Sequence, residues 1–152
     1  MRPNNKHMKK TLSILILTVA VAIGCSSAKS TSKLSKAKDL SFEYSATTRG
    51  SSVNYVVTRD SIIQKENSRG EITTYKKPVD ENDWNDLLTA TEKVDLEKLS
   101  TIEPPSKKHQ FDGAMGATLK ITVNGKTYQT QTFDHGNPPE AIKAIIDNIT
   151  VI

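Results

Sequence analysis

The chain has 152 residues and a formal net charge of +4, a length suited to one folded domain rather than two. Its first 24 residues contain four basic residues and no acidic ones, and the rest of the chain carries 17 basic and 17 acidic residues. A domain without excess positive charge lacks the electrostatic surface that binds nucleic-acid phosphates. The composition therefore excludes a nucleic-acid partner.

The N-terminus has the pattern of an export signal. Lys9 and Lys10 precede an uncharged apolar run over residues 12–24. That run is too short to span roughly 30 Å of hydrocarbon as a helix, but it suits the apolar region of a signal peptide. Met8 with the two lysines already makes a complete basic start, so translation from Met1 and translation from Met8 both stay open.

The apolar run ends in Ala22-Ile23-Gly24-Cys25, which resembles the lipobox of bacterial lipoproteins. Leu is commoner than Ala at the first of these positions. The resemblance implies a diacylglycerol on the sulfur of Cys25, cleavage after Gly24 and acylation of the new amine. Ser26 after the cysteine implies sorting to the outer membrane. We expect a signal peptide over 1–24 and a membrane anchor at Cys25, the only cysteine of the chain; the alternative is an ordinary core cysteine.

Residues 25–39 are rich in serine and lysine, and Leu34 is their one large apolar side chain. Such a segment cannot bury enough surface to offset the entropy lost on ordering. The sequence therefore predicts the lipidated cysteine and a flexible tether over 25–39, followed by a single domain over 40–152.

Four strands are expected in the first half of that domain. Alternating apolar residues predict strands at 40–45 and 53–57, and shorter apolar runs predict strands at 62–63 and 72–75. The turn residues at 49–52 and 67–70 connect them as an antiparallel meander.

A helix is expected to follow, with Asp80 as its N-cap and Val79 packed on Trp84. Trp84, Leu87, Leu88 and Thr91 fall on one helical face, which predicts a core position for the tryptophan. Asp95 begins a second helical turn that brings Leu96, Leu99 and Ile102 inward and ends before Pro104-Pro105.

The Asn124-Gly125 dipeptide predicts a two-residue hairpin. Its register pairs Val123 with Lys126 and, further along, Gly116 with Phe133. In this register Phe133 lies on the face opposite the core and covers Gly116.

A final helix is predicted from Asn137 as N-cap, with Pro138 in its first position and an isoleucine stripe at 142, 145, 146 and 149. The whole order, ββββ-α-ββ-α, predicts an α+β fold: an antiparallel sheet of about six strands with two helices on one face.

Two segments contain residues that could carry chemistry. His109, Asp112, Asp134 and His135 fall near the same end of the predicted sheet, as a weak metal or acid/base site would require. The neighbouring glycines and asparagine favour a turn role instead. No nucleophile elbow, phosphate loop or zinc-protease motif is found. We therefore predict no catalytic residue, no metal, no cofactor and no enzymatic activity.

The segment from Phe42 to Ile149 resembles small uncharacterised bacterial envelope lipoproteins and, more loosely, the emfourin family of inhibitors of thermolysin-like metalloproteases. The similarity lies in the opening strands, the Trp84-Leu87-Leu88 helix, the hairpin and the closing helix. Emfourin-type inhibitors tend to carry Gly-Gly after the first strand, where this chain has Arg49-Gly50-Ser51-Ser52. No inhibitory residue is therefore carried over.

We expect a lipid-anchored protein of the cell envelope, on the outer membrane, whose domain binds an envelope protein without catalysing a reaction. The alternative is an inhibitor of thermolysin-like proteases, and a third is a metal-binding protein or hydrolase that uses the His and Asp residues above. The membrane leaflet, the partner and the oligomeric state stay open.

Overall fold

A computed structural model describes residues 33–152. The expected signal peptide over 1–24, the cleavage site at Gly24 and the lipid site at Cys25 lie outside the described residues. The described elements follow one another as η1 (Lys33–Lys36), β1 (Ser41–Thr48), β2 (Ser51–Thr58), β3 (Ser61–Ser68), β4 (Glu71–Pro78), α2 (Glu81–Thr91), η2 (Leu96–Thr101), η3 (Lys108–Phe111), β5 (Gly116–Val123), β6 (Lys126–Gln129), β7 (Phe133–Asp134) and α3 (Glu140–Val151), where η marks a 3-10 helix.

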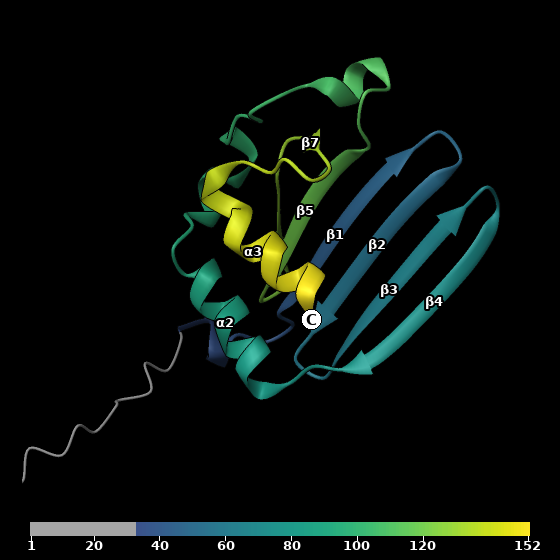
Figure 1. The fold of residues 1–152 in the computed structure, drawn as a ribbon. Coiled ribbons are helices and arrows are strands. Elements are labelled where there is room, and N and C mark those ends of the chain that lie inside the picture. Colours follow the sequence, from purple (N-terminus) through teal and green to yellow (C-terminus); the bar gives the residue numbers. More distant parts are fainter. Residues whose placement is uncertain (1–32) are drawn as a thin grey trace, which may run out of the picture. The chain divides into compact units, whose positions relative to one another are not determined.

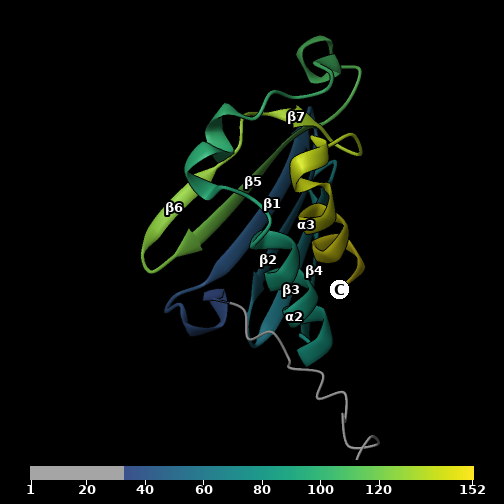
Figure 2. The same ribbon diagram turned by 90° about the vertical axis from the view of Figure 1, so that its left-hand side faces the viewer.

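The strands form one antiparallel sheet in the order β4-β3-β2-β1-β5-β6, and β7 pairs with β5 at its start. Figures 1 and 2 show α2 and α3 packed on the same face of this sheet. The predicted α+β fold, with an antiparallel sheet and two helices on one face, is confirmed. The opposite face of the sheet carries mainly Ser, Thr, Lys and Glu side chains, as antiparallel sheets with one solvated face do.

The core lies between the middle strands and the two helices. Burial alternates along β1 and β5, where every second side chain turns to the helices. The helices contribute the apolar stripes that the sequence predicts, since Trp84, Leu87, Leu88, Ile142, Ile145, Ile146 and Ile149 are all buried. Each such side chain contributes about 1.5–3 kcal/mol to folding by leaving water.

The helix starts near Asp80 and Asp95 are also as predicted. The Asp80 carboxylate accepts a hydrogen bond from the N–H of Asn82 at 2.7 Å, and the Asp95 carboxylate accepts one from the N–H of Glu97 at 3.2 Å. The Asp95 cap begins the 3-10 helix η2, and Leu99 of this helix is fully buried in the core.

The β5–β6 hairpin has the predicted register, with Val123 opposite Lys126. Asn124 and Gly125 both have positive φ, 52° and 81°, as a type I′ turn requires.

The predicted pairing of Gly116 with Phe133 is wrong. Gly116 pairs with Asp134, and Phe133 lies opposite Ala117. The chain leaves the ladder after Gln129 and gains one residue before β7 begins, and in a strand a slip of one residue turns every side chain to the other face. Phe133 is consequently a core residue, 1% exposed, and its ring stacks on Tyr44 at 6.3 Å between centroids.

The predicted N-cap of the last helix is also wrong. The helix α3 begins at Glu140 with Pro139 in the cap position, and the Asn137 side chain instead donates a hydrogen bond to Ser106 Oγ at 2.8 Å. Gly136 has φ +81° and Pro139 has the extended ψ of 139°, so the helix begins only after the second proline.

The packed part of the chain extends N-terminally of Leu40. Lys33–Lys36 form the 3-10 helix η1, and Leu34 packs half-buried against the core. The Lys38 N–H donates to Asn124 Oδ1 at 2.7 Å, and the Asn124 N–H donates to the Lys38 carbonyl at 2.9 Å. These contacts hold residues 33–38 against the domain, because Leu34 packs on the core and the backbone of Lys38 is hydrogen-bonded to Asn124.

Candidate binding surface

Asp134 is the most densely hydrogen-bonded side chain near the predicted chemistry. Its carboxylate is 3% exposed and accepts hydrogen bonds from Ser106 Oγ at 2.5 Å and from the backbone N–H groups of Lys108 at 2.9 Å and His109 at 2.7 Å. The ring Nδ1 of His109 lies 2.6 Å from the same carboxylate.

Two opposing effects act on this carboxyl group. Burial acts to raise the pKa of Asp134, but the hydrogen bonds from Ser106, His109 and Lys108 outweigh it and hold the pKa well below its ordinary value of 3.8. Both oxygens are thereby occupied, and the residue joins the 106–109 segment to β7. This arrangement fixes the position of the 106–109 loop.

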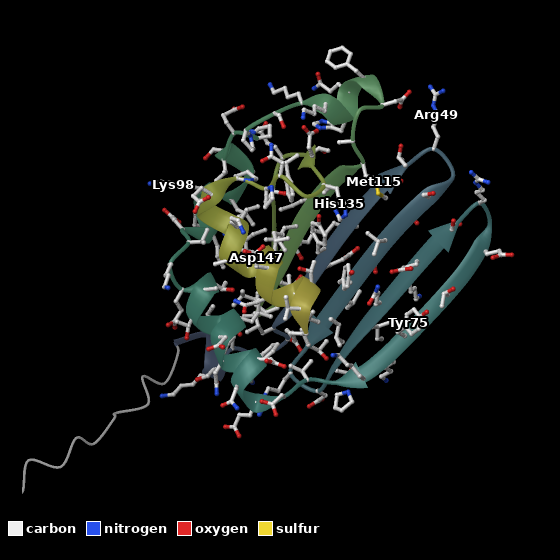
Figure 3. All side chains as sticks on the ribbon, in the orientation of Figure 1. Arg49, Tyr75, Lys98, Met115, His135 and Asp147 are labelled. Carbon is white, nitrogen blue, oxygen red and sulfur yellow. The ribbon has the colours of Figure 1, made fainter. Side chains whose placement is uncertain are left out.

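His135 lies in a different environment. Its Nδ1 is 2.6 Å from the phenol oxygen of Tyr44, and its backbone N–H donates to the Met115 carbonyl at 2.9 Å. Figure 3 shows His135 and Met115 side by side at the end of the sheet where β5 begins. Burial, followed by the charge of Tyr55, raises the pKa of the Tyr44 phenol to about 12, so the phenol stays protonated at neutral pH.

Asp112 is separate from both pairs. It has the left-handed φ of 56° that ends η3, and its exposed carboxylate lies 3.8 Å from Arg49. Of the four residues singled out in the sequence, the structure brings only His109 and Asp134 into contact. Within residues 33–152, no three His, Cys, Asp or Glu side chains are arranged to hold a metal ion.

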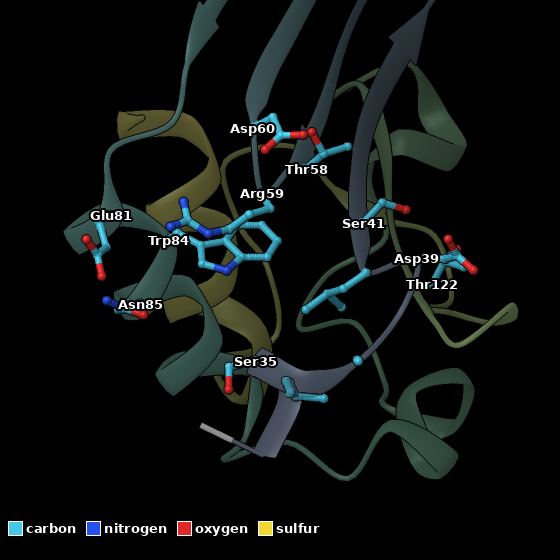
Figure 4. Close-up of a pocket in the computed structure, with 13 residues that line it drawn as sticks. Ser35, Asp39, Ser41, Thr58, Arg59, Asp60, Glu81, Trp84, Asn85 and Thr122 are labelled. Atoms are coloured by element: carbon cyan, nitrogen blue, oxygen red, sulfur yellow. The ribbon is translucent and has the colours of Figure 1, made fainter. Parts of the chain in front are cut away.

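A cavity of about 650 Å³ lies where η1, the β2–β3 turn and the start of α2 meet. Figure 4 shows Thr58 and Asp60 from the turn, Glu81 and Asn85 from α2, and Ser35 from the N-terminal segment around it. Ligand sites commonly combine an apolar lining with a few converging polar groups. Here the lining is mixed, and the described residues contain no buried side-chain N or O atom without a hydrogen-bond partner. The lining includes the charged side chains of Arg59, Asp60 and Glu81, and no observation on the described residues points to a particular ligand for them.

The feature that stands out is the half of the sheet that the helices do not cover. All eight residues of β4 are exposed, and this strand pairs only with β3 in the described part of the chain. Figure 1 shows β3 and β4 extending well beyond α3. We call the helix-side surface of these two strands the open sheet face.

Large apolar side chains remain exposed in this region. Tyr75, labelled in Figure 3, is 58% exposed on the open sheet face, and Ile72 is 71% exposed on the other side of β4. A groove of about 480 Å³ runs from Tyr75 and Tyr55 to the last turn of α3, where Val151 is 85% exposed. Tyrosine and isoleucine on both sides of an edge strand form a surface that a protein partner can cover.

This surface was not among the predicted sites, although the sequence contains a signal for it. Buried strands show one apolar face, whereas 64–77 alternates Gln, Lys, Glu, Thr and Tyr with no such face. Two helices of 11 and 12 residues are also too short to cover six strands spaced about 4.8 Å apart.

No family model, curated protein or solved structure matches the chain. The resemblance to envelope lipoproteins and to emfourin-type inhibitors therefore stays a prediction from the sequence. In the described part of the chain, the helices lack the combined length and hydropathy of a membrane span.

Proposed function

We propose that this protein is a lipid-anchored protein of the cell envelope whose domain binds another protein through the open sheet face and β4, without catalysing a reaction. The observation that carries the proposal is β4 itself: an edge strand of eight residues, exposed on both sides, with Ile72 and Tyr75 in solvent.

The chemistry of this surface suits a protein rather than a small ligand. The groove is bordered by Tyr55 and Tyr75, and aromatic side chains are enriched in protein interfaces. Lys76 and Lys77 lie at the end of β4 nearest the groove. The partner surface therefore combines apolar side chains with a carboxylate that faces these lysines.

In this proposal the candidate residues have a structural role, because they pair with neighbouring loop and core groups. His109 is hydrogen-bonded to Asp134, and His135 is hydrogen-bonded to Tyr44. The Asp134 carboxylate has four hydrogen-bond donors on its two oxygens, and Asp112, which could have joined it, lies instead beside Arg49.

The anchor is tested with Cys25→Ser. Wild-type protein is expected in the membrane fraction with incorporated fatty acid, and the variant is expected unprocessed and without label, because the sulfur carries the first acyl chains. Equal fatty-acid labelling of wild type and variant would contradict the anchor.

The binding surface is tested by chemical cross-linking in cells followed by mass spectrometry. Ile72→Ser and Tyr75→Ser remove the exposed apolar groups of β4, and Phe111→Ser removes a side chain that is 83% exposed on η3. A partner that is captured by wild type and by Phe111→Ser, but is lost with both β4 variants, supports the proposal. Equal capture by all four proteins would contradict it.

A further inference from the structure

The backbone of β4 has an open hydrogen-bonding edge. The β3–β4 connection is a two-residue turn, Arg69-Gly70 with φ of 53° and 95°, closed by the pair Ser68 and Glu71. In such a turn the closing pair exchanges hydrogen bonds, and every second pair after it does the same. The Val79 N–H, which donates to the Asp60 carbonyl at 3.4 Å, belongs to the same series at the far end of the hairpin.

The alternation fixes which residues face the free edge. Glu71, Thr73, Tyr75 and Lys77 direct their backbone groups to β3, so Ile72, Thr74 and Lys76 direct theirs outward. Pro78 lies in the outward series too, but it has no N–H to donate.

We propose that β4 pairs antiparallel with β4 of a second copy of this chain, about a two-fold axis at Thr74. Thr74 then lies opposite Thr74 of the second copy, and Ile72 lies opposite Lys76 of the second copy. Three outward residues on each strand form about six backbone hydrogen bonds. The two sheets become one continuous sheet.

Side-chain charge supports this register. Opposed residues in an antiparallel pair share a face, so Glu71 lies opposite Lys77 of the second copy, and the two-fold axis makes this contact twice. Neither residue forms an ion pair within residues 33–152. On the same face Tyr75 meets Thr73 of the second copy.

The two neighbouring registers are worse. Sliding the strands one way puts Pro78, without an N–H, opposite Ile72 and moves Glu71 away from Lys77 of the second copy, so the ion pair is lost. Sliding them the other way puts Lys77 opposite Arg69, a pair of like charges that is destabilising. The register centred on Thr74 avoids both.

The other edge of the sheet is built differently. The strand β6 has four residues, and η2 braces it through Glu97, which lies 2.7 Å from Lys126 Nζ and 3.2 Å from the hydroxyl of Tyr128. In the described part of the chain, β4 is the edge strand that offers eight residues. Pairing uses its backbone and leaves the open sheet faces of both copies uncovered, so the inference goes beyond the proposed function and does not depend on the anchor or on another partner.

A cysteine cross-link tests the axis directly, because only Thr74 faces its own counterpart across it. The full chain carrying Thr74→Cys, purified in detergent, is expected to form a disulfide-linked dimer on mild oxidation. The controls are the parent chain, with Cys25 alone, and Thr127→Cys on β6. Dimer formed by Thr74→Cys no faster than by both controls, or linked only through Cys25, would overturn the proposal.

Charge reversal tests the register without a thiol. Glu71→Lys places two pairs of like charges across the axis and is expected to weaken self-association roughly tenfold in sedimentation experiments at low salt. The double variant Glu71→Lys/Lys77→Glu is expected to restore it. If the parent chain is monomeric throughout, or if the double variant is as weak as the single one, the proposed pairing is wrong.

Discussion

The phenol oxygen of Tyr44 lies 2.6 Å from Nδ1 of His135, which joins the central strand β1 to the loop that leads into α3. Tyr44 is 1% exposed, and its ring also stacks on the His135 ring at 5.9 Å between centroids. One histidine of the predicted chemical site is thus a packing partner of the core residue Tyr44, whose ring also stacks on Phe133.

Replacing Tyr44 by Phe keeps the ring stacking and removes the hydrogen bond to His135. We expect the free energy of unfolding to fall by about 1 kcal/mol, the usual net contribution of such a bond, as measured by urea denaturation. Tyr75→Phe, at an exposed position on β4, is the control and is expected to leave the free energy unchanged. A loss of the same size in both variants would contradict the role given to the Tyr44–His135 bond.

Alkaline pH provides a second test of Tyr44. Its pKa is raised from 10.0 to about 12 in the folded protein, first by burial and then by Tyr55. The unfolded chain therefore loses the phenol proton first, and the corresponding stability is present below pH 10 and is lost between pH 10 and 12. Absorbance titration should show a late tyrosinate signal that is absent from Tyr44→Phe and retained in Tyr75→Phe.

The hydrogen bonds of Asp134 are expected to make the stability of the folded protein sensitive to acid. Its pKa is depressed in the folded state because its hydrogen bonds outweigh the effect of burial, so its stabilisation is present above the unfolded value of 3.8 and is lost as the pH falls below it. Thermal unfolding between pH 7 and pH 2 should show a smaller acid loss in Asp134→Asn than in the wild type. Asp147→Asn, which removes an exposed partner of Lys143, should keep the full acid loss.

Phe133 and Phe111 form a matched pair of phenylalanines. Phe133→Ala empties a position in the core next to Tyr44 and is expected to cost about 3–5 kcal/mol in the free energy of unfolding. Phe111→Ala, at a position 83% exposed, is expected to cost almost nothing. Equal losses of unfolding free energy in the two variants would contradict the buried position of Phe133 and support the register in which it faces solvent.

The elements with strong local signals were predictable from the sequence. Asn124-Gly125 determined both the turn and the register next to it, since few other dipeptides adopt two positive φ values. The Asp80 cap and the isoleucine stripe of α3 depend on side chains within one or two helical turns, and both predictions were correct.

The wrong predictions concern residues whose positions depend on contacts with residues far away in the sequence. The extra residue between β6 and β7 moves Phe133 into the core, and Thr130 holds the displaced chain through hydrogen bonds with Leu119. Asn137 has a partner 31 positions away in Ser106 and is not a helix cap. The contact of His109 with Asp134, across 25 positions, likewise needed the fold to be seen.

The two hydrogen bonds between Lys38 and Asn124 have a mechanical consequence. A pulling force applied to the chain before Lys33 acts on these two hydrogen bonds before it reaches any strand. The two bonds connect the chain at Lys38 to the β5–β6 turn. Beyond these bonds the force enters β1, which is paired along its length with β2 on one side and β5 on the other. Tension along β1 must shear both ladders together, whereas the β3–β4 hairpin, at the far side of the sheet, carries little of it.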